Sequence, residues 1–140
     1  MLDLAAAQKI LATALDYAVE HRFKPMAIGV LDARGALKAF VAQDGTSLKR
    51  GEIALAKANG ALSLGMGSRA LMQRAELQPY FITAATAAIG GALVPVPGGV
   101  LIKAAGKIIG AVGISGDTSD NDEAAAISGI LAAGFEADGC

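Results

Sequence analysis

The sequence predicts a single α+β domain in which helices flank an antiparallel sheet. The chain has 140 residues, which suits one domain with its own core. Hydrophobic residues make up 54% of it and charged residues 18%, a composition that excludes intrinsic disorder. Hairpin patterns at residues 26–43 and 100–115 are flanked by helical patterns. Because hairpins rather than βαβ units pair these strands, we expect an antiparallel sheet within one domain, residues 1–140.

The first third of the chain predicts a helix followed by a hairpin. Apolar residues recur at helical spacing over residues 3–20, and Asp3 is suited to cap the helix start. Residues 26–32 and 36–43 have the composition of strands. A short turn at residues 33–35 joins them, where glycine permits a positive φ.

The middle of the chain predicts two helices. A loop at residues 44–47 ends in an N-cap, and an alanine-rich helix follows over residues 48–64. Glycines at 65 and 67 interrupt this pattern. Ser68 is then predicted to cap a shorter helix that ends near Ala75.

The last third returns to strands. Residues 80–88 are ambiguous, since the alanines favour a helix whereas Tyr80 to Thr83 favour a strand. Residues 90–99 are then predicted to form a loop, and residues 100–104 and 107–115 a hairpin. A final helix is predicted to end near Ala133, with Thr118, Ser119 or Asp120 as its cap. Glycines inside the second strand, Gly110 and Gly113, predict a close approach of another backbone or helix.

Charge is distributed unevenly along the chain. The net charge of −1 argues against a nucleic-acid-binding protein that depends on a broad basic field. Residues 1–110 hold all 12 lysines and arginines, whereas residues 111–140 hold none and six of the 13 acidic residues. Either the acidic part packs on the basic part, or a basic mouth attracts small anions. Candidates for such a mouth are Lys49, Arg50, Lys57, Arg69 and Arg74.

Residues 77–102 contain no charged residue, which raises the question of a membrane span. Three prolines and four glycines interrupt this stretch and would break backbone hydrogen bonds that lipid cannot replace. We therefore expect no membrane association. No pattern typical of a signal peptide is present, so the cytoplasm is the expected location.

The inventory of reactive side chains is small. With one histidine, His21, and one cysteine, Cys140, the sequence excludes a multi-histidine or cysteine-based metal site and does not favour a catalytic triad. His21 at a helix end is either a solvated side chain or a single axial ligand for haem iron. Gly98 and Gly99 lack the spacing of a phosphate-binding loop, so nucleotide binding is not expected and tight packing explains them better.

Lys57 is the one charged residue within residues 53–61. It either extends its ammonium group to solvent or faces a pocket, where it holds a carboxylate or has a lowered pKa suited to imine or base chemistry. Asp44 is a candidate loop cap or base, and Tyr80 a candidate phenol donor at a pocket rim.

Three stretches resemble one known family. They are Val30 to Phe40 followed by Asp44-Gly45, the helix Ala54 to Ala61 around Lys57, and Pro97-Gly98-Gly99 with Gly106 to Gly116 and Asp120 to Glu123. In this order they are similar to the GlcG/HbpS-like family of haem-degrading and haem-binding domains, which includes the C-terminal domain of PduO-type corrinoid adenosyltransferases. The resemblance covers about residues 3–134. It implies a profilin-like α+β fold, homo-oligomers and, for some members, haem binding.

Three functions remain open at this point. The first is binding of haem or another small anion, with His21 as axial ligand and Arg50, Lys57, Gly98 and Gly99 in the binding site. The second is an accessory enzyme of small organic-acid or aromatic catabolism, in which Lys57 and Arg50 hold a carboxylate and Asp44 or Tyr80 moves a proton. The third is an oligomeric structural or regulatory partner without a small ligand.

Overall fold

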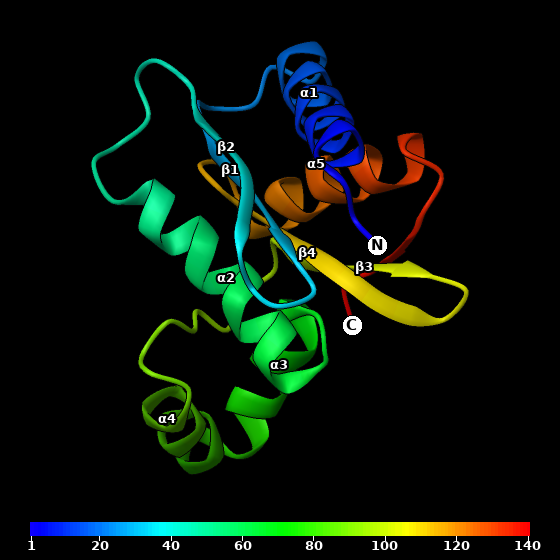
Figure 1. The fold of residues 1–140 in the computed structure, drawn as a ribbon. Coiled ribbons are helices and arrows are strands. Elements are labelled where there is room, and N and C mark those ends of the chain that lie inside the picture. Colours follow the sequence, from blue (N-terminus) through cyan, green and yellow to red (C-terminus); the bar gives the residue numbers. More distant parts are fainter.

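A computed structural model describes residues 1–140 and has the α+β architecture that the sequence predicts (Figure 1). An antiparallel sheet lies at its centre, and helices cover both faces. The elements in chain order are α1 (Leu4–Glu20), β1 (Ala27–Asp32), β2 (Leu37–Ala42), α2 (Arg50–Leu64), α3 (Ser68–Leu77), α4 (Pro79–Ala88), β3 (Gly99–Ala104), β4 (Lys107–Ser115), α5 (Ser119–Ala132) and β5 (Glu136–Asp138).

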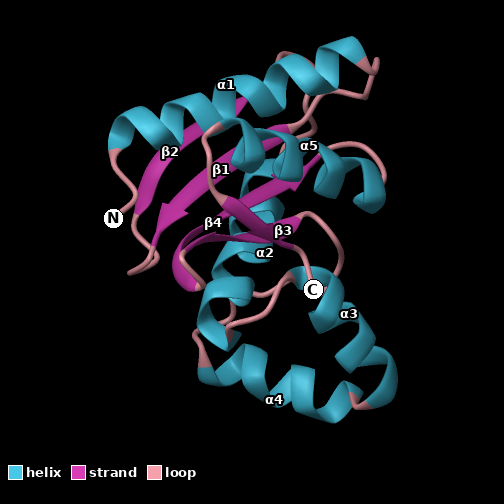
Figure 2. Ribbon diagram, turned by 90° about the vertical axis from the view of Figure 1, so that its right-hand side faces the viewer, coloured by secondary structure: helices cyan, strands magenta, loops and turns pink.

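The sheet has the strand order β2-β1-β4-β3-β5, and every neighbouring pair is antiparallel. The two hairpins are thus joined side by side through β1 and β4. Figure 2 shows α1 and α5 on one face of this sheet and α2 on the other, with α3 and α4 continuing from α2. Strand β5, three residues long, was not predicted, because such a short segment carries no readable alternation.

Two cores follow from this layering. The larger lies between the sheet and helices α1 and α5, and its fully buried members include Ile10, Val30, Val112 and Ile130. The smaller lies under α2 and contains Leu31, Ala58, Ala61, Leu101 and Ala111. Adjacent residues such as Val30 and Leu31 of β1 therefore face different cores, as the period of two in a pleated strand requires.

Glycines in β4 permit the close packing that the sequence predicts. A Cβ at Gly113 would lie 3.0 Å from the Cβ of Ala58 and closer still to the backbone of α2. A Cβ at Gly110 would lie 3.0 Å from Leu2. Both contacts are shorter than ordinary van der Waals distances, so the expected close approach is confirmed at both positions.

The predicted caps are partly confirmed. Asp3 accepts a hydrogen bond from the Ala6 N–H, and Thr118 caps α5 by accepting from the Asn121 N–H. Helix α2, however, begins at Arg50 without a side-chain cap. Ser68 is also not a cap: Gly67 occupies that position, and Ser68 is the first residue of α3.

A tertiary contact explains why Ser68 does not cap α3. Its hydroxyl is fully buried, accepts the Gly99 N–H at 2.7 Å and donates to the Gly99 carbonyl at 3.2 Å. Bonding to β3 therefore replaces capping of its own helix. The C-terminal tail instead supplies partners for this end of α3, since the Gly67 N–H donates to the Cys140 carbonyl.

The ambiguous residues 80–88 form helix α4. Pro79 occupies the first turn, where its missing N–H costs nothing. The hydroxyls of Thr83 and Thr86 donate to carbonyls four residues earlier and so find partners within the helix. Ile82 and Ala85 lie three residues apart and are both buried, so packing overrides strand propensity. None of the helices combines the length and apolar character needed to cross a membrane.

The acidic C-terminal part packs on the basic part, which was one of the two interpretations of the charge asymmetry. Lys57 pairs with Asp122, Arg69 with Asp120 and Glu123, and Lys103 with Asp138. The hydrogen bonds to Glu123 are the main cause that raises the pKa of Arg69. Two cations of the expected basic mouth, Lys57 and Arg69, are therefore neutralised within the fold.

Candidate functional site

His21 lies at the end of α1, where the backbone makes a Schellman motif. The Phe23 N–H donates to the Ala18 carbonyl at 2.9 Å, and the Arg22 N–H donates to the Val19 carbonyl at 3.1 Å. Arg22 holds the left-handed conformation of this motif, with φ of 56°. The motif ends the helix before Pro25 and leaves His21 exposed as the C-cap.

The hydrogen bond of the His21 ring fixes its tautomer. Nδ1 lies 2.8 Å from the Tyr17 carbonyl oxygen, which can only accept. Nδ1 must therefore carry the proton, and in the neutral ring Nε2 keeps its lone pair. Metal-ligating histidines commonly have this arrangement, in which a carbonyl orients the ring through the other nitrogen.

Aromatic rings surround the imidazole. The Tyr17 ring stacks on His21 with centroids 3.9 Å apart and planes 20° apart. Phe23 lies 5.6 Å from His21 and meets Tyr17 edge-on at 5.9 Å. Two of the six aromatic residues of the chain thus flank its one histidine, and they limit the rotation of its ring.

Two free cations follow His21. Arg22 and Lys24 are exposed, and neither side chain makes an ion pair or a hydrogen bond. The Lys24 N–H donates to Asp117 at 2.7 Å, and this bond is the main cause that lowers the pKa of that carboxyl group. The end of α1 therefore presents an imidazole beside two cations that make no ion pair or hydrogen bond.

Lys57 is buried and lies in no cavity. Its side chain is 2% exposed. The ammonium group donates to the Ile114 carbonyl at 2.8 Å and to Asp122 Oδ2 at 3.2 Å, so that it joins α2, β4 and α5. Burial lowers the pKa of Lys57, although attraction to Asp122 opposes that shift.

Asp122 is buried as completely as Lys57, at 1% exposure. Besides the ammonium group it accepts the Asp117 N–H at 2.9 Å and the Gly116 N–H at 3.4 Å. Burial raises the pKa of Asp122, and Lys57 and these N–H groups oppose the shift. No buried side-chain nitrogen or oxygen of the chain lacks a partner, so the pair is internally satisfied.

Gly98 and Gly99 adjoin this ion pair rather than a cavity. Gly98 has φ of 125°, and a Cβ there would lie 2.8 Å from Lys57 Nζ and 2.6 Å from the Ile114 carbonyl oxygen. A Cβ at Gly99 would lie 2.9 Å from Ser68 Oγ. These glycines allow the start of β3 to pack against α2 at Lys57.

Of the other candidate residues, Arg50 lies near Lys57, whereas Asp44 and Tyr80 do not. Arg50 donates to Ser115 Oγ at 3.0 Å and to Ser47 Oγ at 3.3 Å, and its charge contributes to the lowered pKa of Lys57. Asp44 is exposed in the loop between β2 and α2. Tyr80 is 70% exposed on α4. The structure thus assembles Lys57 with Asp122, a partner that sequence spacing did not identify because 65 residues separate the two.

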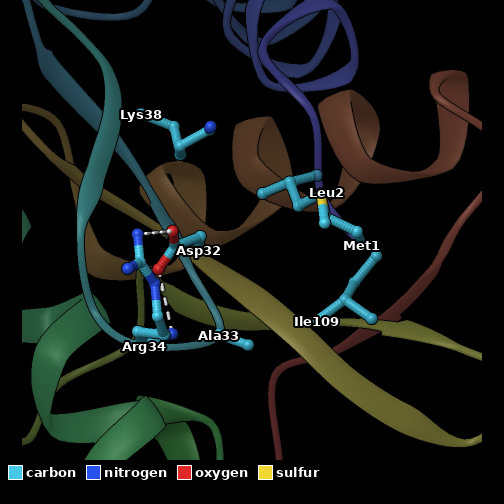
Figure 3. A pocket seen from close by; sticks show the side chains of 7 residues that line it. All are labelled: Met1, Leu2, Asp32, Ala33, Arg34, Lys38 and Ile109. Carbon is cyan, nitrogen blue, oxygen red and sulfur yellow. Dashed lines mark hydrogen bonds and ion pairs between the residues drawn. The ribbon is translucent and has the colours of Figure 1, made fainter.

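Two cavities open elsewhere on the surface. One of about 360 Å³ lies between the N-terminus and the β1–β2 turn and is lined by Met1, Leu2, Asp32, Ala33, Arg34, Lys38 and Ile109 (Figure 3). The other, of about 390 Å³, lies between the first hairpin and α2 and is lined by Leu31, Gly35, Leu37, Glu52, Leu55, Ala56, Asn59 and Ala92. Both are at the small end of the range for ligand pockets. No pattern in the sequence pointed to either cavity.

A comparison with known protein families gives a match over most of the chain. The family of haem degrading proteins described as HbpS-like matches residues 2–131. No curated protein is significantly similar to this sequence.

Several solved structures share the fold. Protein ORFY of Klebsiella pneumoniae is 26% identical, with a TM-score of 0.84 over 94% of this chain and 89% of that one. HbpS is 25% identical, with a TM-score of 0.81 over 93% and 88%. A complex of PduOC with haem is 22% identical, with a TM-score of 0.84 over 94% of each chain, and at this identity the likeness shows the fold.

Proposed function

Because this chain belongs to the HbpS-like family of haem degrading proteins, we propose that it binds haem and that His21 is the axial ligand. The observation that carries the proposal is the hydrogen bond from His21 Nδ1 to the Tyr17 carbonyl, which leaves Nε2 as a lone-pair donor on an exposed ring. A related fold has been solved as a haem complex, which supports the same ligand class.

The residues around His21 fit an iron porphyrin in their chemistry. Bound haem would supply one-electron and oxygen chemistry at its iron. Tyr17 fixes the ring through its carbonyl and its aromatic face. Phe23 adds apolar surface beside the imidazole. Arg22 and Lys24, whose side chains make no ion pair or hydrogen bond, are suited to bind the two propionates.

A haem titration of the purified protein, followed at the Soret band, tests this proposal. We expect saturation near one haem per chain. The His21→Ala variant should lose the saturable band, because it removes the only imidazole of the chain. Glu20→Ala is the matched control, since it changes an exposed side chain of the same helical turn. Unchanged saturable absorbance in His21→Ala would contradict the proposed ligand.

The alternative of an accessory enzyme that uses Lys57 has less support. Imine or base chemistry requires an amine that a substrate can reach, but Lys57 is enclosed, and neither cavity is lined by it. Asp44 and Tyr80 lie on separate exposed segments rather than beside Lys57. We therefore propose a structural role for Lys57.

We also propose that the chain associates with itself. Strand β2 is an edge of the sheet, and its Leu37 and Phe40 are 53% and 43% exposed. Exposed apolar edge strands favour pairing with a further chain. Light scattering coupled to size-exclusion chromatography would detect a mass above the 14.0 kDa of one chain.

A further inference from the structure

The two hairpins each contain a β-bulge at the same end of the sheet. In the first hairpin Val30 pairs with Ala39 and Leu31 with Leu37, so Lys38 has no partner. In the second hairpin Ile102 pairs with Gly110 and Lys103 with Ile108, so Ile109 has no partner. Because β1 and β4 are neighbours, and Asp32 pairs with Gly110, the two bulges lie near each other.

Each bulge reverses the alternation of its strand. Ala39 and Val41 face the core beneath α1, so regular alternation would turn Lys38 toward α2. Instead Leu37 faces the α2 side, where it lines the other cavity, and Lys38 lines the cavity beside Leu2.

The second hairpin shows the same reversal. Val112 lies in the core beneath α1, and regular alternation would place Ile109 on the opposite face. Instead Ile108 packs against the α2 core and Ile109 against the α1 core. Bulges re-aim side chains in this way and are frequent beside functional sites.

The re-aimed side chains meet in the cavity of about 360 Å³. Leu2, 2% exposed, forms part of its apolar wall and packs where Gly110 lacks a Cβ. Figure 3 shows Met1, Leu2 and Ile109 gathered on one side of the cavity and Asp32 with Arg34 on the other.

Among the charged side chains that line the cavity, Lys38 is the one cation without a partner. Asp32 accepts the N–H groups of Arg34 and Ala36 at 2.9 and 3.0 Å and pairs with the Arg34 guanidinium at 3.1 Å. Burial raises the pKa of Asp32, but these bonds outweigh it and lower the pKa overall, so the carboxylate is ionised and internally paired. Lys38 is half-buried and makes no ion pair or hydrogen bond. The cavity therefore combines an apolar wall with the unpaired ammonium group of the Lys38 side chain.

We propose that this cavity binds a small monocarboxylic acid, whose carboxylate contacts Lys38 and whose aromatic or aliphatic body contacts Leu2 and Ile109. The Lys38 ammonium group matches a carboxylate, and the apolar wall matches an uncharged body. The site involves none of the residues proposed to bind haem, so the two proposals stand or fall separately.

An NMR titration with benzoate and its neutral isostere benzamide tests the site, and hexanoate with hexanamide repeats the test for an aliphatic body. We expect saturable shifts at Leu2, Lys38 and Ile109 with at least one of the acids in the millimolar range, and binding of its amide at least five-fold weaker. Lys38→Gln should abolish the preference for acid over amide. Lys107→Gln, which removes the exposed lysine at the start of β4 outside the cavity, should retain it.

Three results would overturn the proposal: no saturable shift with either acid, shifts confined to residues outside the cavity, or equal affinity for acid and amide. Two-dimensional spectra of each variant show directly whether it is folded. The haem titration of Lys38→Gln should match that of the unsubstituted protein, which separates this site from His21.

Discussion

Lys57 and His21 are the two residues that the sequence suggested for catalysis or ligand binding. The fold buries Lys57 and leaves His21 exposed. Lys57 is 2% exposed and both of its polar contacts are internal, to Ile114 and Asp122. His21 is exposed, and its single hydrogen bond leaves one ring nitrogen free. An isolated reactive side chain in a sequence thus says little about accessibility. A reactive side chain whose partners all lie within the chain is structural, whereas one with a free polar atom at the surface can bind a ligand.

The largest expected effect is a loss of stability that tests the structural role of Lys57. Asp122→Ala removes the counter-ion of a buried ammonium group and should destabilise the fold by about 3–5 kcal/mol. Urea unfolding would measure the loss. His21→Ala, by contrast, should change the free energy of unfolding by roughly 0.5 kcal/mol or less, because an exposed side chain is removed.

The double variant Lys57→Met, Asp122→Leu serves as the control for that loss. It replaces the ion pair by apolar groups, so it should recover much of the stability that Asp122→Ala loses. A small effect of Asp122→Ala alone, below about 1 kcal/mol, would mean that Lys57 reaches solvent and would remove the distinction between the two residues.

A smaller effect on stability is expected at Asp117, which connects the surroundings of His21 with the buried pair of Lys57 and Asp122. Asp117 accepts the Lys24 N–H beside His21, and its own N–H donates to Asp122. Its pKa is lowered in the fold, first through the Lys24 N–H, from an ordinary value of 3.8. The folded state therefore binds fewer protons than the unfolded state just below pH 3.8, and stability falls as the pH drops through that window.

Asp117→Asn tests the direction of this change of stability with pH. The variant should be less stable than the unsubstituted protein at pH 7 and should approach it as the pH falls below 3.8, because protonation removes the same charge. Urea unfolding at a series of pH values would measure the difference. A constant difference at all pH values would assign the effect to packing rather than to the carboxylate.

Much of the fold was readable from the sequence because it depends on local signals. The caps at Asp3 and Thr118, the two hairpins and the strand glycines were all expected and are present. The family resemblance was confirmed over residues 2–131. Boundaries failed where tertiary contacts decide, as at Ser68, whose hydroxyl bonds to β3 instead of capping α3.

The sites were less readable, for physical reasons. The partner of Lys57 is 65 residues away, and no local pattern specifies that pairing. The cavity at Lys38 depends on two bulges, each of which reverses the facing of residues beyond it. A reader who assumes regular alternation places Lys38 and Ile109 on the wrong face of the sheet.

The smallest expected effect concerns Arg22, which follows His21 in the left-handed region with φ of 56°. Glycine adopts this conformation without steric cost, so Arg22→Gly should raise the free energy of unfolding by about 0.5–1 kcal/mol. Ala105→Gly, at φ of 50° in the β3–β4 turn, is the matched control and should stabilise by a similar amount.

The two variants should differ in haem affinity. Arg22→Gly also removes one of the cations proposed to meet the propionates, so it should bind haem more weakly although it is more stable. Ala105→Gly should be more stable with unchanged haem affinity. Chemical unfolding and Soret titration on the same samples would measure both quantities. Equal haem affinity in the two variants would remove Arg22 from the site, whereas opposite changes in stability and binding would show that arginine is kept at this position for its charge despite the strain.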